Sequence, residues 1–477
     1  MRYLFILILL ILPLKNILAA LPTEQDVVSS VLKFYPKILQ EEENLKGQKA
    51  DYLSKQGLFD ANITGGRRLY KNGLYDNRYY DEITLTKPLP FANAEVFSSY
   101  SKSTENPYPL ANDSDNTLSD GRAKIGFSMS LLRGFLTNEN VTEVSVSNIG
   151  IDIAKEKMRL TKLTVINKAK KAYYNYMTAI DSYNIALNIV KLRQERLEQI
   201  TIQSKAGDKP KIYVVDSERL LLNSKSDLIN AEQNLQSASF LLSIYYRDSQ
   251  GDKINIHQDN NILASVMLEN NIKLPQKASI NQEIKNIKQR RADIRIIDLK
   301  IAQEKKYLKL YKNQFLPDLD FKFSASKDFG NDAIKPNLNA IKRDERLNFG
   351  VNLSIPLQTK KQSGLYSKAR AKINSFRMKK ILIQDSIEID IRSIYNQIIS
   401  FNEIYRNLKQ EAKMSQTLLE AEKIRFKNGD SDIISINIRE QDLFSAKQRM
   451  IESLKKVLSL IADYNLLIMK NYTDSSL

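Results

Sequence analysis

Cysteine and tryptophan are absent from the 477-residue sequence, histidine occurs once, and glycine and proline are scarce, with 15 and 12 residues. Without cysteine, the chain can form neither a disulfide nor a thiolate metal site. The single histidine, His257, stands in the polar segment GDKINIHQDNN, where we expect a solvent-exposed side chain and not a catalytic base. No group of residues predicts an enzyme, a cofactor or a metal site. The scarcity of helix breakers favours long helices.

Long apolar runs are also missing beyond the N-terminus, because no later segment reaches the ~18 consecutive apolar residues of a membrane-spanning helix. The N-terminus itself combines Arg2, an apolar run from Tyr3 to Leu14 and the small pair Ala19–Ala20. This pattern predicts a secretory signal peptide over residues 1–20, with an uncleaved anchor as the alternative. Since no cysteine follows, a lipid attached to an N-terminal cysteine is excluded.

The formal net charge is +17, from 72 Lys and Arg and 55 Asp and Glu residues. A surplus of this size can indicate a nucleic-acid partner or an anionic surface. Here, however, basic and acidic residues alternate along the expected helices. Clusters such as Arg67–Arg68 and Lys288–Arg291 are short and carry no nucleic-acid-reading motif. The sequence therefore favours solvated helical surfaces and predicts no nucleic-acid partner.

The sequence contains an internal repeat. Residues 127–245 align without a gap with residues 349–467, and LEQITIQSKAGD (197–208) shares six of twelve residues with LEAEKIRFKNGD (419–430). Each copy has the pattern of a strand, a long helix, a glycine turn and a second helix, which makes the repeat a supersecondary unit. The predicted organisation is a signal peptide (1–20), a first repeat (21–245), a linker or equatorial region (246–290), a second repeat (291–470) and a tail (471–477).

Alternating apolar and polar residues predict four short strands per chain. They are residues 81–85, 125–131, 319–325 and 347–357, and a further strand can begin at Ala61–Ile63. The first strand pair carries an extra segment around Tyr70–Asp120, whose Tyr, Asn, Ser, Asp and Pro content predicts a long external loop. Four strands cannot close a barrel, since the smallest has about eight. In a membrane, several chains would therefore have to share one barrel, because unpaired strand edges are too costly in lipid.

Two unusually long helices are predicted, over about residues 141–206 and 364–428, because both stretches lack proline and space their apolar residues helically. At a rise of 1.5 Å per residue, each would be ~100 Å long. Shorter helices are expected at 210–246 and 432–469, after the glycine turns, and at 35–61 and 291–314, before the strands. Shorter helices stacked end to end beside a long one would build a coiled-coil wall.

In this order, the segments resemble the TolC-like outer-membrane efflux protein family. The resemblance covers nearly the whole chain after the signal peptide. It rests on RFKNGDSDIISINIREQDLFSAKQRM (425–450), its weaker copy KAGDKPKIYVVDSERLLLNSKSDL (205–228), RRADIRIIDLKIAQEKKYLKLYKNQFLPDLDF (290–321) and LLRGF (131–135). It implies an α+β membrane protein of mostly long coiled-coil α-helices. Four strands per chain would contribute to a trimeric, twelve-stranded outer-membrane β-barrel.

The resemblance also implies a function. The protein would be a passive exit duct in the bacterial outer membrane, with a large periplasmic portion, for efflux or type I secretion. Its implied partners are further copies of itself in a homotrimer, a periplasmic adaptor protein, an inner-membrane transporter and outer-membrane lipid. Two alternatives stay open. A trimeric coiled-coil adhesin would have one terminal anchor without duplicated strands, and a periplasmic adaptor would lack the alternating strands.

The glycine turns are the implied sites. In the family, rings of aspartates often close the tunnel entrance, six and nine residues after the glycine of the second turn, where this chain has Ser435 and Ile438. The same offsets in the first copy give Tyr213 and Asp216, so Asp216 is the single acid that matches. With Asp432 near the second turn, these residues form the predicted tunnel entrance, for which we expect a less cation-selective gate.

The turns themselves, with Gly207, Asp208, Gly429 and Asp430, are the predicted docking sites for adaptor helices. The alternative is purely structural, because glycine permits the tight backbone turn that joins two antiparallel helices.

Overall fold

The computed structural model of the chain describes residues 21–72, 75–103, 117–254, 256, 268–269, 272–276, 280–330 and 345–470. The predicted signal peptide, His257 and the tail at 471–477 lie outside the described residues. The chain divides into two compact units. The sheet unit comprises residues 41–160 and 289–386, and the helical unit comprises residues 1–40, 161–288 and 387–477.

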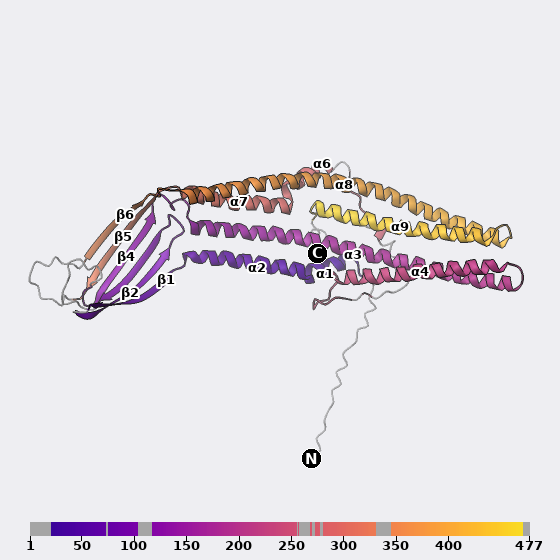
Figure 1. Ribbon diagram of the computed structural model, residues 1–477, viewed down its shortest axis with the longest axis horizontal. Coiled ribbons are helices and arrows are strands. Elements are labelled where there is room, and N and C mark those ends of the chain that lie inside the picture. The colour runs from indigo at the N-terminus through magenta and orange to yellow at the C-terminus, as the bar shows by residue number, and fades with distance from the viewer. Residues whose placement is uncertain are drawn as a thin grey trace, which may run out of the picture. The chain divides into compact units, whose positions relative to one another are not determined.

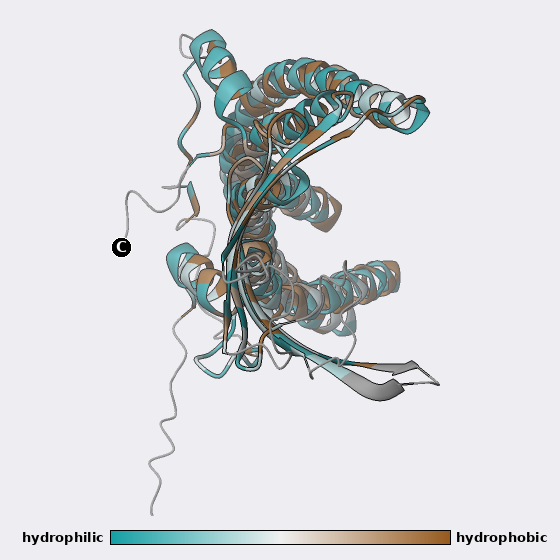
Figure 2. Ribbon diagram, turned by 90° about the vertical axis from the view of Figure 1, so that its left-hand side faces the viewer, coloured by the Kyte–Doolittle hydropathy of each residue, from teal (hydrophilic) through white to brown (hydrophobic). Residues whose placement is uncertain are grey.

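The sheet unit contains one antiparallel sheet, in which six strands lie in chain order (Figure 1). The strands are β1 (Asn62–Asn72), β2 (Tyr75–Pro88), β3 (Glu95–Ser103), β4 (Gly121–Ser130), β5 (Asp318–Phe329) and β6 (Glu345–Ser354). The four predicted strands overlap β2, β4, β5 and β6, although two of them were expected to end one to three residues later, and β1 begins where a further strand was expected. In side view the sheet is a curved layer (Figure 2).

The prediction of four strands per chain was wrong, because the described residues form six. The extra segment around Tyr70–Asp120, expected to be an external loop, contains β2 and β3. The sequence of β3, EVFSSYSKS, has the serine-rich composition of a loop, and three of its four serines occupy one face. Ser99, Ser101 and Ser103 are buried nonetheless, and β3 pairs with β2 on one side and with β4 on the other. Pairing on both sides outweighs the weak strand propensity of serine.

A tight turn joins β2 to β3. The amide of Leu89 donates to the Ala94 carbonyl at 2.7 Å, and Ala92 and Asn93 adopt positive φ angles of 49° and 50°. The amide of Ser130, at the end of β4, donates to the Ala92 carbonyl at 2.8 Å. The turn is therefore fixed to the end of a neighbouring strand.

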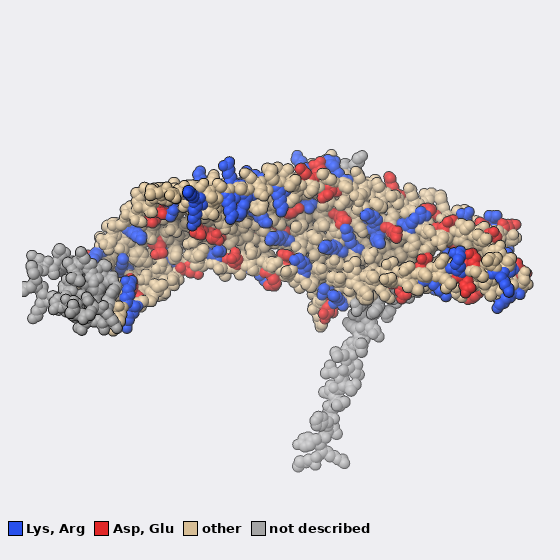
Figure 3. All heavy atoms as spheres, viewed as in Figure 1, with Lys and Arg blue, Asp and Glu red and all other residues tan. Residues whose placement is uncertain are grey.

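The chain has two very long helices, α3 (Glu139–Lys205) and α8 (Lys360–Lys427), which confirms the expectation from the sequence. Four shorter helices also lie where they were predicted: α2 (Pro36–Gln56), α4 (Lys211–Ser243), α7 (Ala292–Asn313) and α9 (Ile433–Leu467). The helices α1 (Glu24–Phe34) and α6 (Ile280–Arg290) and the short η1 (Gly57–Phe59) were not predicted. Basic and acidic side chains are interspersed over the visible face of the helices (Figure 3). Among the helices described, none is long and apolar enough to cross a membrane.

In the sheet unit, polar contacts join four helix segments side by side, in the order α2, α3, α7 and α8. Lys55 of α2 lies 3.2 Å from Glu143 of α3, and the Tyr307 hydroxyl of α7 donates to Glu143 at 3.0 Å. On the other side of α7, Lys380 of α8 lies 2.7 Å from Asp298. Burial and the neighbouring Glu143 raise the pKa of Tyr307, which keeps this hydroxyl a hydrogen-bond donor. The four segments form a single layer.

In the helical unit, apolar side chains on α3 and α9 form much of the buried interior. Tyr176 and Met177 of α3 and Leu454 and Val457 of α9 are almost fully buried. At the edge of this interior, Asp463 of α9 accepts hydrogen bonds from Asn167 and Lys171 of α3, at 2.9 and 2.6 Å. The apolar contacts supply the stabilisation, and the polar contacts fix the alignment of the two helices.

Replacing Gly126 with alanine is expected to destabilise the sheet. The added methyl carbon would lie 2.5 Å from both the Phe323 carbonyl oxygen and the Phe97 ring, so neighbouring strands would have to shift. Overpacking of this kind costs about 1–3 kcal/mol, which should lower the thermal unfolding temperature in detergent. Gly66→Ala is the matched control, because nothing lies within 4 Å of a methyl group at that position. Equal unfolding temperatures for the two variants would contradict the described packing of β3, β4 and β5.

Candidate functional site

The pairing of the strands gives the sheet one apolar face. Three successive rungs across β4, β5 and β6 carry only apolar side chains there: Ile125–Ala325–Leu347, Phe127–Phe323–Phe349 and Met129–Phe321–Val351. Leu347, Phe349 and Val351 are 67%, 70% and 67% exposed. A contiguous patch of large exposed apolar side chains marks a surface that meets a protein or a membrane.

The apolar face continues across β3, β2 and β1. Ile125 of β4 lies opposite Ser98, which lies opposite Leu85, which in turn lies opposite Ile63. Ile63, Leu85 and their neighbours Ile83 and Tyr100 are exposed. The same face is therefore open on all six strands.

Charged and aromatic side chains border this face near the end of β1 and the start of β6. Arg67 donates to both carboxylate oxygens of Asp81, at 2.6 and 2.8 Å, and its guanidinium carbon lies 5.5 Å from the centre of the Tyr79 ring. Lys327 donates to Glu345 at 3.0 Å. An apolar band flanked by aromatic and polar side chains is typical of sheets that face a lipid bilayer.

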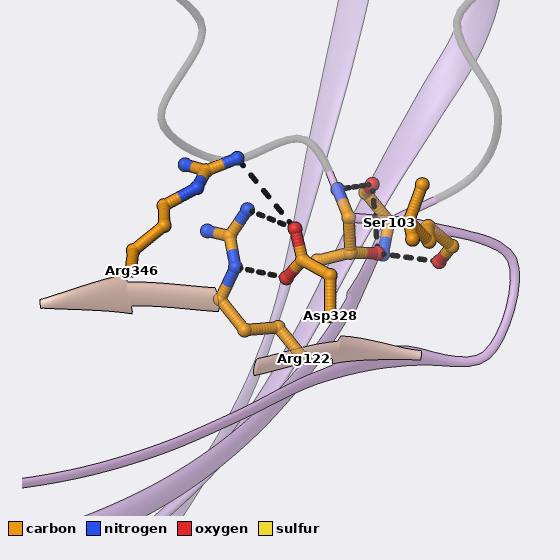
Figure 4. A network of polar contacts seen from close by, with 6 residues as sticks. Ser103, Arg122, Asp328 and Arg346 are labelled. Carbon is orange, nitrogen blue, oxygen red and sulfur yellow. Dashed lines mark hydrogen bonds and ion pairs between the residues drawn. The ribbon is translucent and has the colours of Figure 1, made fainter. Parts of the chain in front are cut away.

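The opposite face of the sheet is polar and more enclosed. Five of its serines are only 5–8% exposed, namely Ser99, Ser101, Ser103, Ser130 and Ser324. On this face, Arg122 of β4 and Arg346 of β6 both contact Asp328 of β5, with nitrogen–oxygen distances of 3.1 and 3.5 Å (Figure 4). Two guanidinium groups share this carboxylate, so the network ties β4, β5 and β6 together on the polar face. A face of this kind can line a water-filled path for solutes.

The two glycine turns of the helical unit have the same backbone geometry. Gly207 and Gly429 both have a φ angle of 85°, which favours glycine. The amide of Asp208 donates to the Gln203 carbonyl at 2.9 Å, and the amide of Asp430 donates to the Arg425 carbonyl at the same distance. This is the hydrogen bond of a glycine-terminated helix. All four predicted docking residues are exposed, and their contact with an adaptor stays a prediction.

The predicted entrance residues are held in local helical structure. Asp432 caps α9, accepting a hydrogen bond from the Ser435 amide at 2.8 Å, and this bond is the main cause that keeps the pKa of Asp432 below its ordinary value. Asp216 is half-exposed and accepts a hydrogen bond from Arg219 at 2.8 Å. Tyr213 is half-buried, and Ile438 is exposed. The single matching acid therefore already has a basic partner on its own helix.

Sequence reasoning missed an exposed apolar stripe near the turns. It consists of Ile212, Val215 and Leu222 on α4 and Ile434 and Ile438 on α9, all 48–66% exposed. Within each helix these residues recur at intervals of three, four or seven, so they share one face. The interval was readable in the sequence. The pattern alone could not show that these side chains are exposed in the folded chain.

Sequence reasoning also missed a polar link between the two helix pairs. Arg193 of α3 donates to the Leu220 carbonyl of α4 at 2.9 Å and to Gln441 of α9 at 2.7 Å. Beside it, Arg196 of α3 donates to Glu440 of α9 at 3.1 Å, and the Glu440 side chain is fully enclosed. Burial is the main cause that lowers the pKa of Arg193 from its usual value. These contacts join the pair α3–α4 to α9.

No protein-family model matches the sequence, and no curated protein matches it either. Solved structures do match. The open-state outer membrane channel MtrE of Neisseria gonorrhoeae superposes with a TM-score of 0.67 at 14% identity, covering 94% of this chain and 89% of that one. For the outer membrane channel CmeC of Campylobacter jejuni, the TM-score is 0.64 at 13% identity, over 93% and 85% of the two chains. For the outer membrane protein VceC of Vibrio cholerae, it is 0.62 at 12% identity, over 93% and 95%.

The chain therefore has the fold of outer-membrane channel proteins. Its sequence resemblance to the TolC-like family is confirmed at the level of the fold, across more than nine-tenths of its length. At 12–14% identity, the comparison does not carry over the role of any single residue.

Replacing Glu440 with glutamine is expected to loosen the link between α3 and α9. Arg196 would keep its charge, with only 11% of its side chain exposed, and would lose its carboxylate partner. Breaking a buried pair costs about 3–5 kcal/mol, so amide hydrogen exchange should accelerate around residues 190–200 and 433–445. Asp442→Asn is the matched control, because that side chain is 51% exposed.

Replacing both partners with apolar residues, Arg196→Met with Glu440→Leu, should restore slow exchange, because no unpaired charge is left behind. Wild-type exchange rates in Glu440→Gln would contradict a structural role for the pair.

Proposed function

We propose that the chain is one subunit of an outer-membrane channel, which acts as a passive exit duct for efflux or type I secretion. The observation that carries the proposal is the likeness in fold to outer-membrane channels over 93–94% of the chain. The two faces of the sheet support it independently. The apolar face suits outer-membrane lipid, and the polar face suits an aqueous path.

Self-association follows from the edges of the sheet. Strands β1 and β6 each have a paired strand on one side only. In lipid, every unpaired backbone group costs several kcal/mol, so the edges must pair with further copies of the chain. We infer a homotrimer whose sheets join into one closed barrel.

The helical unit is the proposed periplasmic part. Its two turns, at Gly207 and Gly429, are exposed and have the same backbone geometry. The apolar stripe beside them offers a face for a helix of a partner or of a neighbouring subunit. A periplasmic adaptor would dock here, and an inner-membrane transporter would supply substrate and energy.

The two halves of the chain are proposed to be copies of one unit. Their long helices have 67 and 68 residues, and the returning helices have 33 and 35. Together with the matching turns, these lengths support the internal repeat suggested by the sequence.

The native mass after mild detergent extraction from the outer membrane tests the assembly. We expect the mass of three chains, and we expect ion conductance when this species is added to a planar bilayer. A monomer would leave sheet edges open in lipid and would contradict the proposal. An adhesin would give the trimer without conductance, and a periplasmic adaptor would be recovered outside the membrane fraction.

The proposed gate has weak cation selectivity, because Asp216 is paired with Arg219. Asp216→Asn should therefore leave the reversal potential in a salt gradient nearly unchanged. Arg219→Gln should shift it toward cation selectivity, because each subunit then exposes an uncompensated carboxylate. Glu218→Gln, an exposed neighbour on the same helix, is the matched control. If Asp216→Asn shifted the reversal potential strongly or abolished cation selectivity, the assignment of Asp216 as a paired gate acid would be wrong.

A further inference from the structure

The resemblance to known channels implies four strands per chain, whereas this chain has six. We infer that all six strands belong to the wall of the barrel, so that β1 of one copy pairs with β6 of the next and three copies close eighteen strands. The inference rests on the proposed function, since it assumes an assembly in the outer membrane. The alternative is a twelve-stranded wall, built from β3 to β6, with β1 and β2 outside it.

The apolar face extends across the whole sheet. A rung of paired residues crosses the entire sheet, from Ile63 and Leu85 through Ser98 and Ile125 to Ala325 and Leu347. Ile63 is 70% exposed and Leu347 is 67% exposed, at opposite edges. Strands that stood outside the membrane would not need the same alternation, in phase, as the strands within it.

A regular ladder of paired residues holds β2 to β3. Residues from Tyr80 to Pro88 pair one by one with residues from Ser103 back to Glu95, without a bulge. Excluding β1 and β2 from the wall would require this ladder to open, and each backbone group exposed to hydrocarbon costs several kcal/mol. The turn between the two strands is also fixed to β4, by the hydrogen bond from Ser130 to Ala92. The wall therefore keeps all six strands.

The helix layer of the sheet unit and a wall of six strands have similar widths. The sheet unit places four helix segments side by side, from α2 to α8. At 8–10 Å between helix axes, the layer is about 36 Å wide. Strands 4.8 Å apart and tilted by about 40° each occupy about 6.3 Å of a barrel's circumference. Six strands then span about 38 Å, and four span about 25 Å. Six strands match the width of the helical layer of the same chain.

The two edges are also compatible with each other. Strand β1 leaves the helices and β6 returns to them, so edges of neighbouring copies would meet antiparallel. Arg67, near the outer end of β1, projects on the same face as Glu345, at the outer end of β6, and their side chains are 67% and 75% exposed. The partner that fits the β1 edge is therefore the β6 edge of a second copy of this chain. Since barrel diameter grows about linearly with strand number, eighteen strands would make the ring roughly 1.5 times as wide as twelve.

The absence of cysteine makes the joint directly testable. Cysteine is introduced on the polar face of β1, at Thr64 or Arg68, and combined with cysteine on the polar face of β6. The β6 positions are Asn348, Asn352 and Ser354. Opposed cysteines in neighbouring strands oxidise when their Cα atoms lie within about 7 Å. We expect at least one combination to give covalent dimers and trimers on denaturing gels without reductant.

The matched control places cysteine at Ser99 of β3, on the same polar face, with the same β6 partners. It should give no covalent oligomers. Cross-links from Ser99, or none from β1 in variants that retain the native mass of three chains, would overturn the six-strand wall and leave the proposed function intact. A native mass other than three chains for the wild-type protein, which has no cysteine, would instead overturn the proposed function.

Discussion

A backbone amide or carbonyl group that is removed from water must find another partner, and this requirement governs the architecture of the sheet. Inside the sheet, each strand from β2 to β5 pairs on both sides. At β1 and β6, one side of the backbone is left without a strand. A water-exposed edge tolerates this, but an edge in hydrocarbon does not. The side chains also fit one surface in hydrocarbon and one in water, because the face that carries Phe349 is apolar and the face that carries Asp328 is polar. Backbone and side chains both support the proposed closed ring of several copies.

The helical part solves a different problem, which is to keep very long helices in register. Buried apolar surface between α3 and α9 is large but non-directional, so two helices packed by it alone could slide past one another. Polar contacts at fixed positions remove that freedom. Asp463 accepts hydrogen bonds from two side chains of α3, and Glu440 forms an ion pair with Arg196 of the same helix. A buried charge pair adds little net stability, but a shift in register would separate the two charges at high cost. Register at the proposed entrance therefore depends on a few polar residues.

Six of the helices could be predicted from the sequence to within a few residues, whereas α1, α6 and β3 could not. A helix such as α3 repeats its apolar pattern over many turns, so local evidence accumulates, and Asp432 marks the start of α9 by its capping chemistry. In β3, only Val96, Phe97 and Tyr100 are strongly apolar, and three of its four serines lie on a face buried by curvature and by neighbouring strands. Local composition cannot reveal burial that arises from pairing with distant residues. The link between Arg193 and Gln441 was hidden for the same reason, since 248 residues separate its two ends.

The edges that would complete the proposed assembly would be a hazard in a single chain, because an open strand edge pairs readily with any other. The edges of this sheet carry charges that oppose such indiscriminate pairing. Strand β1 has Arg67 and Arg68 in succession, and β6 begins with Glu345 and Arg346. Arg67 and Arg68 each have a carboxylate partner on β2, Asp81 and Glu82, so charged side chains cover this edge without leaving it strongly positive. The proposed pairing of β1 with β6 joins two different edges, and such head-to-tail joining generates a ring when the rotation closes.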